Sequence, residues 1–89
     1  MIERQSYRPV PVDAATTADM DEQAQLLREA FADNRANALG VVAAELKQQQ
    51  RIVDGTHPDE RLKTEAERAK AAYRLEKYRE LEAEFQNNS

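Results

Sequence analysis

The residue types best suited to catalysis or metal binding are sparse in this chain. His57 is the only histidine, no cysteine is present, and no serine stands near His57. One histidine with scattered carboxylates does not give the ligand spacing of a zinc site. Two glycines are too few for a loop that cradles phosphate. We therefore predict a protein that is not an enzyme and holds no metal or cofactor, with His57 capping a helix or facing solvent.

Carboxylates are abundant, but their spacing is that of a helix surface. Glu76, Glu80 and Glu84 follow one another at four-residue intervals, which places them on one face of a helix. Di-metal sites in helical bundles need Glu-x-x-His pairs on facing helices, and this pattern is absent from the sequence. The carboxylates are therefore interpreted as a solvated face.

A basic stretch extends from Arg61 to Arg79, with seven bases and three acids. Several of the bases have acidic partners three or four residues away, as on a salt-bridged helix surface. The net charge of the whole chain is −4, which argues against nucleic-acid binding. The first interpretation is an ordinary charged surface, the second a contact with an acidic protein, and the third a weak nucleic-acid site. The arginines of this possible acidic-partner contact are Arg61, Arg68, Arg74 and Arg79.

The elements that position these residues begin with an N-terminal arm over residues 1–18. Pro9 and Pro11 exclude a regular helix there and favour an extended chain. The arm is either a disordered tail or a segment that docks on a partner. Its apolar residues for such docking are Ile2, Tyr7, Val10 and Val12.

A long helix is predicted over about residues 19–53, with Thr17 or Asp19 as its N-cap. At about 100° per residue, one set of apolar side chains falls within an arc of roughly 100°. These residues are Met20, Ala24, Leu27, Phe31, Ala38, Val42, Leu46 and Val53. Asn34 interrupts the stripe, and Gly40 costs about 1 kcal/mol relative to alanine in a helix. We expect Gly40 to leave room for a bulky side chain of the facing helix.

The predicted turn covers residues 54–57 and a second helix follows over about 58–86. Gly55 suits the left-handed position after a helix, and Pro58 suits a first helical turn. Such a short connection makes the two helices antiparallel neighbours. In this register Leu46 meets Ala66, and Tyr73 lies above Gly40. Residues 87–89 are expected to fray.

The second helix carries two apolar stripes roughly 150° apart, by the geometry of about 100° per residue. Leu62, Ala66, Ala69 and Tyr73 form the stripe assigned to the first helix. The other stripe cannot face the same partner helix, and an exposed apolar patch marks an interaction site. We therefore predict a protein interface, formed with a second copy or with another protein, and the alternative is that the arm covers it. The residues of this predicted interface are Leu75, Tyr78, Leu81 and Phe85, with Tyr7, Val10 and Val12 from the arm.

The fold class expected is all-α, a helical hairpin with an extended N-terminal arm. No apolar run approaches the roughly 20 residues of a membrane span, and no signal peptide is recognisable. We expect a soluble protein of the cytoplasm or of an intracellular assembly. Its expected function is that of a non-catalytic assembly subunit, packing as multiple copies or onto a larger scaffold, such as a bacteriophage or bacterial complex. The alternative is a small inhibitor that occludes a bacterial target, and the third reading is a weak nucleic-acid-binding module, because architecture alone does not fix function.

Overall fold

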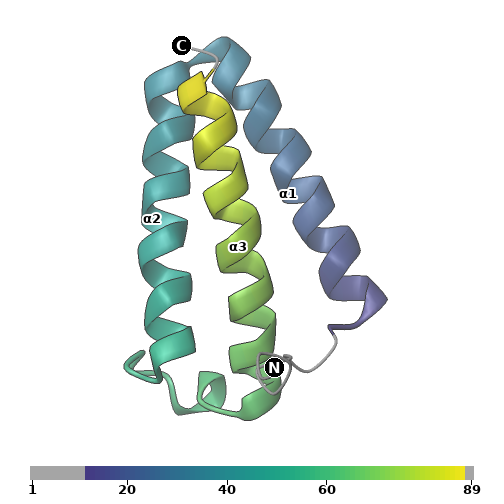
Figure 1. The fold of residues 1–89 in the computed structure, drawn as a ribbon, viewed down its shortest axis with the longest axis vertical. Coiled ribbons are helices and arrows are strands. Elements are labelled where there is room, and N and C mark those ends of the chain that lie inside the picture. Colours follow the sequence, from purple (N-terminus) through teal and green to yellow (C-terminus); the bar gives the residue numbers. More distant parts are fainter. Residues whose placement is uncertain (1–11, 88–89) are drawn as a thin grey trace, which may run out of the picture.

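The computed structural model describes residues 12–87 of the 89-residue chain. Its helices are α1 (Ala14–Asp33), α2 (Arg35–Asp54) and α3 (Glu65–Asn87), with a short 3₁₀ turn, η2 (Glu60–Leu62), before α3. Figure 1 shows α2 and α3 side by side and antiparallel, with α1 folded back along them. The predicted all-helical class and the long helical hairpin are confirmed by α2 and α3.

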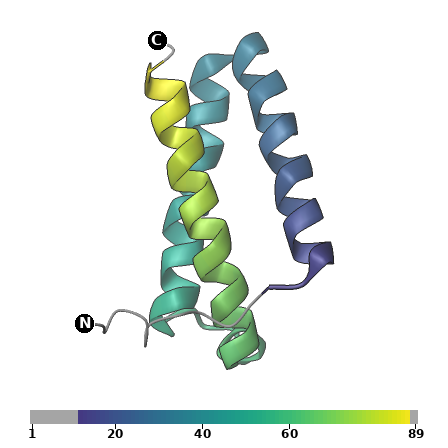
Figure 2. The same cartoon turned by 45° about the vertical axis from the view of Figure 1, so that its right-hand side comes forward.

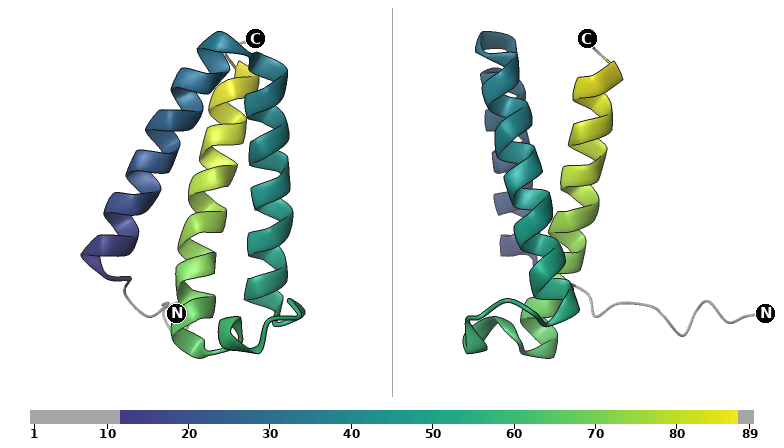
Figure 3. Two further views of the ribbon diagram at one scale, coloured as in Figure 1. Left: turned by 180° about the vertical axis from the view of Figure 1, so that it is seen from behind. Right: turned by 90° about the vertical axis from the view of Figure 1, so that its left-hand side faces the viewer.

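The single helix predicted over residues 19–53 is wrong, because the chain breaks at Asn34. This residue has an extended backbone, with φ −148° and ψ 94°. Its side-chain oxygen accepts a hydrogen bond from the backbone N–H of Asn37 at 3.1 Å, and its own N–H donates to the carbonyl of Ala30 at 2.7 Å. Asparagine is among the best N-cap residues because its side chain satisfies a free helical N–H. Asn34 thus ends α1 and begins α2, and the chain reverses direction there, as the left view of Figure 3 shows.

The first helix also begins earlier than predicted, which shortens the arm expected over residues 1–18. The carboxylate of Asp13 accepts a hydrogen bond from the backbone N–H of Thr16 at 2.9 Å, and α1 starts at Ala14. Hydrogen bonding from Thr16 lowers the pKa of Asp13 below its ordinary value. The N-cap is therefore Asp13, rather than Thr17 or Asp19.

The end of α2 agrees with the prediction made from Gly55. Gly55 has φ +76°, in the left-handed region, which glycine adopts without a Cβ penalty. The N–H of Thr56 donates to the carbonyl of Arg51 at 2.9 Å, and the N–H of Gly55 donates to the carbonyl of Ile52 at 3.1 Å. This pair of bonds is the Schellman motif, which satisfies the last carbonyls of a helix.

The start of α3 is Glu65, later than the predicted start at Pro58. The hydroxyl of Thr64 accepts a hydrogen bond from the backbone N–H of Glu67 at 3.2 Å, which is the N-terminal half of a capping box. Asp59 caps the short turn η2 instead of the long helix. The connection is therefore longer than expected, and the register of α3 against α2 changes.

The changed register removes the predicted role of Gly40. A Cβ built on Gly40 would meet no atom within 4 Å, so no side chain of α3 fills the space above it. Tyr73, predicted to lie there, packs half-buried against the edge of the core. Ala66, predicted to face Leu46, is exposed. Gly40 is an exposed helical glycine without a packing function.

The core lies where all three helices meet. Its largest fully buried side chain is Phe85 of α3, whose ring stacks on Phe31 of α1 with centroids 4.3 Å apart and an angle of 9° between the planes. Offset or stacked aromatic pairs add about 0.5–1.5 kcal/mol beyond the burial of their area. The buried members of the core cluster are Met20, Leu27, Ala38, Val42, Tyr78, Leu81 and Phe85.

The outward placement of the stripe Leu75, Tyr78, Leu81 and Phe85 is wrong. These side chains are only 7%, 4%, 2% and 1% exposed. The reason is the break at Asn34, which folds α1 back so that α3 packs against two helices rather than one. The stripe assigned to the hairpin contact, from Leu62 to Tyr73, is instead the more exposed one, with its members half-buried or exposed.

The interior becomes more polar toward the end of the bundle that holds the α1 N-terminus. Thr16 and Gln49 are both 94% buried. The amide N–H of Gln49 donates to Glu45 at 3.2 Å, whereas its side-chain oxygen has no hydrogen-bond partner among the described residues. Burial, reinforced by the charge of Glu45, raises the pKa of Tyr78 to about 12. Two buried polar side chains thus lie toward this end of the bundle, alongside the buried Met20.

Candidate interaction surface

The acidic excess of the protein is located on α1. This helix contains five acids and one base, a net charge of −4 that equals the net charge of the whole chain. The remaining residues contain twelve acids and twelve bases, since the chain has 17 and 13 in all. The field around the protein is therefore uneven, and α1 is its negative element.

Four of the five acids of α1 lie on one exposed face around a leucine. The face follows a spacing of three, four, three and four residues, which aligns side chains along a helix. All five of its side chains are exposed. We refer to this set as the acidic face. Its residues are Asp19, Glu22, Leu26, Glu29 and Asp33.

Two large apolar side chains are conspicuously exposed in the part of the chain that the structure describes. Leu26 is 50% exposed and Val41 of α2 is 40% exposed. Leu26 lies eight residues before Asn34 and Val41 seven residues after it. In an antiparallel pair with a rise of 1.5 Å per residue, both lie roughly 11 Å from the break. The two side chains therefore stand at the same level of the α1–α2 pair.

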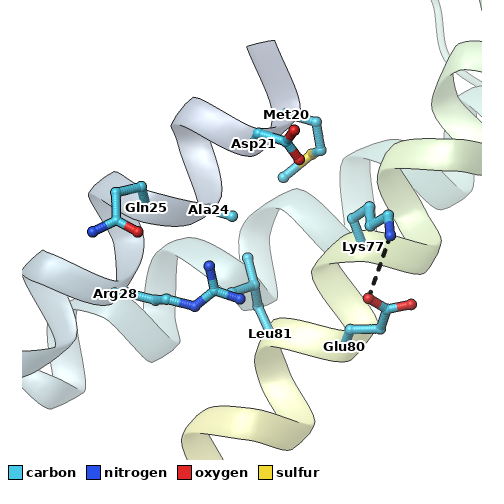
Figure 4. A pocket seen from close by; sticks show the side chains of 8 residues that line it. All are labelled: Met20, Asp21, Ala24, Gln25, Arg28, Lys77, Glu80 and Leu81. Atoms are coloured by element: carbon cyan, nitrogen blue, oxygen red, sulfur yellow. Dashed lines mark ion pairs between the residues drawn. The ribbon is translucent and has the colours of Figure 1, made fainter. Parts of the chain in front are cut away.

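A hollow of about 330 Å³ lies between α1 and α3, on another side of α1 (Figure 4). Met20 and Leu81 at its base are each 2% exposed. Charges of both signs surround it, including Lys77 and Glu80, whose ion pair is 3.6 Å long. The full lining is Met20, Asp21, Ala24, Gln25, Arg28, Lys77, Glu80 and Leu81.

The single base of α1 ties this helix to α3. The guanidinium of Arg28 donates to both carboxylate oxygens of Glu84, at 2.9 and 3.0 Å. This bond raises the pKa of Arg28 and lowers that of Glu84. The side chains of Arg28 and Glu84 are 47% and 37% exposed. Because solvent screens such an exposed ion pair, it stabilises the fold by up to about 1 kcal/mol. Arg28 is thus occupied within the chain and does not offset the charge of the acidic face.

Most of the arginines predicted to contact an acidic partner bind atoms of this chain. Arg61 forms a two-bond pair with the carboxylate of Asp59, at 3.1 and 2.9 Å, which holds the pKa of Asp59 at about 2. Arg68 donates two bonds to the carbonyl of Val53, near the end of α2. These contacts give both arginines a structural part in the connection between α2 and α3.

The other two arginines of that set lie farther along α3. Arg79 donates to the side-chain oxygen of Gln50 at 3.2 Å and so bridges α3 and α2. Arg74 is half-buried, and its positive charge acts to lower the pKa of Tyr78, against the effect of burial. Arg61, Arg68 and Arg79 are thus exposed but hydrogen-bonded within the chain, whereas Arg74 is half-buried.

The remaining sequence-based candidates are local or lie outside the described residues. The Nδ1 atom of His57 accepts a hydrogen bond from the backbone N–H of Asp59 at 3.1 Å. Val12 is half-buried, whereas Tyr7 and Val10 lie outside the described residues. Within residues 12–87, no three His, Asp or Glu side chains are grouped so that they could hold a metal ion. None of the described helices combines the length and apolar character needed to cross a bilayer.

The acidic face has a signal in the sequence that becomes interpretable only with the fold. Acids at positions 19, 22, 29 and 33 already have helical spacing. Their outward orientation follows from the burial of Met20 and Leu27 on the opposite side of α1.

A comparison with models of known protein families, with curated proteins and with solved structures found no match.

Proposed function

We propose that this protein is a non-catalytic subunit that docks onto a larger protein assembly through the acidic face of α1. The observation that carries the proposal is the concentration of the net charge on one exposed helical face with a half-exposed leucine at its centre. The partner that fits is a protein with a basic surface and an apolar recess. Charge complementarity steers such partners together and fixes their orientation.

The apolar centre supplies part of the affinity that charge alone does not. Burying the exposed half of Leu26 would contribute about 1 kcal/mol. Val41 of α2, which is 40% exposed, stands at the same level of the bundle. Salt screens the attraction between exposed charges, and the screening length is already about 8 Å at physiological ionic strength. The attraction therefore weakens further at high salt. Binding is therefore expected to be salt-sensitive but not abolished by salt.

The experiment compares two charge-matched variants of the full chain in affinity capture from the organism's own extract. Glu22→Lys with Glu29→Lys alters the acidic face, and Glu65→Lys with Glu76→Lys alters exposed acids of α3. Both variants change the net charge from −4 to 0. Proteins retained by the native chain are quantified by mass spectrometry, after circular dichroism has established that both variants are folded.

We expect a specific protein to be retained by the native chain and the α3 variant, and lost from the α1 variant. Leu26→Ser should reduce its retention without a change in charge. Equal loss from both charge variants would mean that net charge alone attracts the partner, and the docking face would be wrong. The proposal also fails if no protein distinguishes the native chain from the α1 variant.

A second candidate function uses the same face. A small inhibitor could occlude a basic surface of a target, with acids at helical spacing competing with the natural ligand of that target. This reading predicts a single partner whose activity falls on binding, whereas an assembly subunit joins a complex that remains functional. Assay of the captured partner with and without this protein distinguishes the two.

A further inference from the structure

The break between α1 and α2 consists of one residue. Asp33 ends α1 and Arg35 begins α2, so Asn34 alone departs from helical geometry. The nearest proline to Asn34 is Pro11 and the nearest glycine is Gly40, so neither residue type forces the break. A helix that continued through Asn34 would lose the cap from its side chain. It would gain regular bonds between the carbonyls and N–H groups that now end the two helices.

The buried faces of α1 and α2 remain aligned if the break closes. Met20, Leu27, Ala38 and Val42 are all buried. On one continuous helix at about 100° per residue they would fall within about 60° of one another. A straight helix over residues 14–54 would be roughly 60 Å long, compared with the 40 Å longest dimension of the folded chain. Its α1 half would project beyond its own α3 and leave an apolar groove on its own α2–α3 pair.

We propose that two copies of this chain exchange α1, with Asn34 helical in the exchanged dimer. The occupant of the vacated groove is the α1 helix of the second copy, because that helix has the shape and the partners the groove already holds. Each contact within the chain, such as Phe31 on Phe85 and Arg28 with Glu84, would form again between the two copies. Exchange of identical elements is a low-cost route to a dimer for this reason.

The attachment of α1 favours such an exchange. α1 packs less extensively on either neighbour than α2 and α3 pack on each other. Figure 1 shows α1 leaning away from α3 toward the N-terminal end of α1, and Figure 2 shows α1 to the right of the α2–α3 pair. That end of the interior contains buried Thr16 and Gln49, and the Gln49 side-chain oxygen has no partner among the described residues. Opening can therefore begin there, with Asn34 as the hinge. The exchange uses the inner side of α1 and does not depend on docking through its acidic face.

Two substitutions at the hinge shift the equilibrium in opposite directions. Asn34→Ala removes the cap that stabilises the break, and should lower the dimer dissociation constant by roughly thirtyfold, about fivefold for each hinge. Arg35→Pro suits the present structure, because proline is favoured at the first position of a helix and Asn34 before it is already extended. In a continuous helix, however, the same proline would clash with the preceding turn. It should raise the dissociation constant by more than about a thousandfold. Arg35→Ala controls for the lost arginine side chain.

The experiment measures the molar mass of the full untagged chain by light scattering after gel filtration, over a concentration series. We expect a dimer whose fraction grows in Asn34→Ala, is unchanged in Arg35→Ala and disappears in Arg35→Pro. Circular dichroism should show a folded monomer for Arg35→Pro. A native dimer that survives in Arg35→Pro would overturn the exchange in favour of docking between intact copies. Monomers for both the native chain and Asn34→Ala at millimolar concentration would overturn it as well.

A cross-link identifies the exchanged helix directly. The chain has no cysteine, so Arg28→Cys and Glu84→Cys can be made in separate copies, mixed, and joined by a short bis-maleimide. Exchange predicts a cross-linked pair between the two different variants, formed slowly after mixing because α1 must first leave its own bundle. Adding Arg35→Pro to both copies should remove the product. A product that persists with this proline would contradict the exchange.

Discussion

Replacing Phe85 by alanine tests whether the C-terminal half of α3 belongs to the core of the single chain. The side chain is 1% exposed and stacks on Phe31 at 4.3 Å. Truncation of a buried phenylalanine costs about 3–5 kcal/mol, because burial is lost and a cavity remains. A chain of this length has a total stability of about 4–13 kcal/mol, at roughly 0.05–0.15 kcal/mol per residue. Phe85→Ala should therefore remove about a quarter or more of the free energy of unfolding, and could leave the chain unfolded at room temperature.

The assay is urea denaturation followed by circular dichroism at 222 nm, at low protein concentration so that association adds little to stability. Leu26→Ala is the matched control, since this leucine is 50% exposed and its truncation should cost about 0.5 kcal/mol or less. If Phe85 instead faced another protein, its truncation would leave the unfolding midpoint near that of the native chain and weaken association only. That outcome would refute the burial of α3 beneath α1.

Three further perturbations address single features of the bundle. Gly40→Ala should stabilise the chain by about 1 kcal/mol, because its Cβ meets nothing and alanine is the better helix former. Gly55→Ala should destabilise it by about 1 kcal/mol, because φ is +76°. The melting temperature should therefore rise in Gly40→Ala and fall in Gly55→Ala, and equal shifts would contradict these two predictions. Gln49→Leu should stabilise the chain by about 1 kcal/mol, because it removes a buried oxygen without a partner in the described residues, and a lower urea midpoint would contradict this. Burial raises the pKa of Tyr78 to about 12, so the neutral phenol favours the folded state. This stabilisation of the fold is complete below pH 10, the pKa of the tyrosine in the unfolded chain. It is lost as the pH rises through 12. Ultraviolet titration of native chain and Tyr78→Phe measures it, and a Tyr78 that ionises near pH 10 in the folded chain would contradict its burial.

The features fixed by short-range chemistry are those that the sequence predicts well. The left-handed Gly55 after a run of helix-forming residues identifies the end of α2, and the structure places it there. The helical class follows from composition, and the antiparallel α2–α3 pair follows from the turn. The start of α3 is less well predicted because two signals compete within seven residues. Pro58 suggests a first turn, but Thr64 with Glu67 three residues later provides the hydrogen-bonded cap that α3 uses.

The orientation of α3 could not be predicted from its own residues. Its two apolar stripes are visible in the sequence, and the choice between them depends on how many helices α3 contacts. With one partner helix, the stripe from Leu75 to Phe85 has no place inside the chain. With α1 folded back, the same stripe becomes the core. The candidate surface has the same dependence, because Leu26 and its neighbouring acids face outward only once the opposite side of α1 is buried.

The break at Asn34 is decided by burial, and this explains why the local sequence is ambiguous. An asparagine cap contributes about 1 kcal/mol, which is comparable to the gain from continuing a helix through the same position. The apolar residues on either side remain in one stripe whether the helix bends or not. What a bent chain gains is the burial of Met20 and Leu27 in the core and the stacking of Phe31 on Phe85, and each large apolar side chain that is fully buried contributes about 1.5–3 kcal/mol. A single copy obtains this burial only by breaking at Asn34, because its straight form has nothing to cover α1. In the proposed exchange two copies obtain it with the helix unbroken, so the conformation of Asn34 would depend on whether a second chain is present.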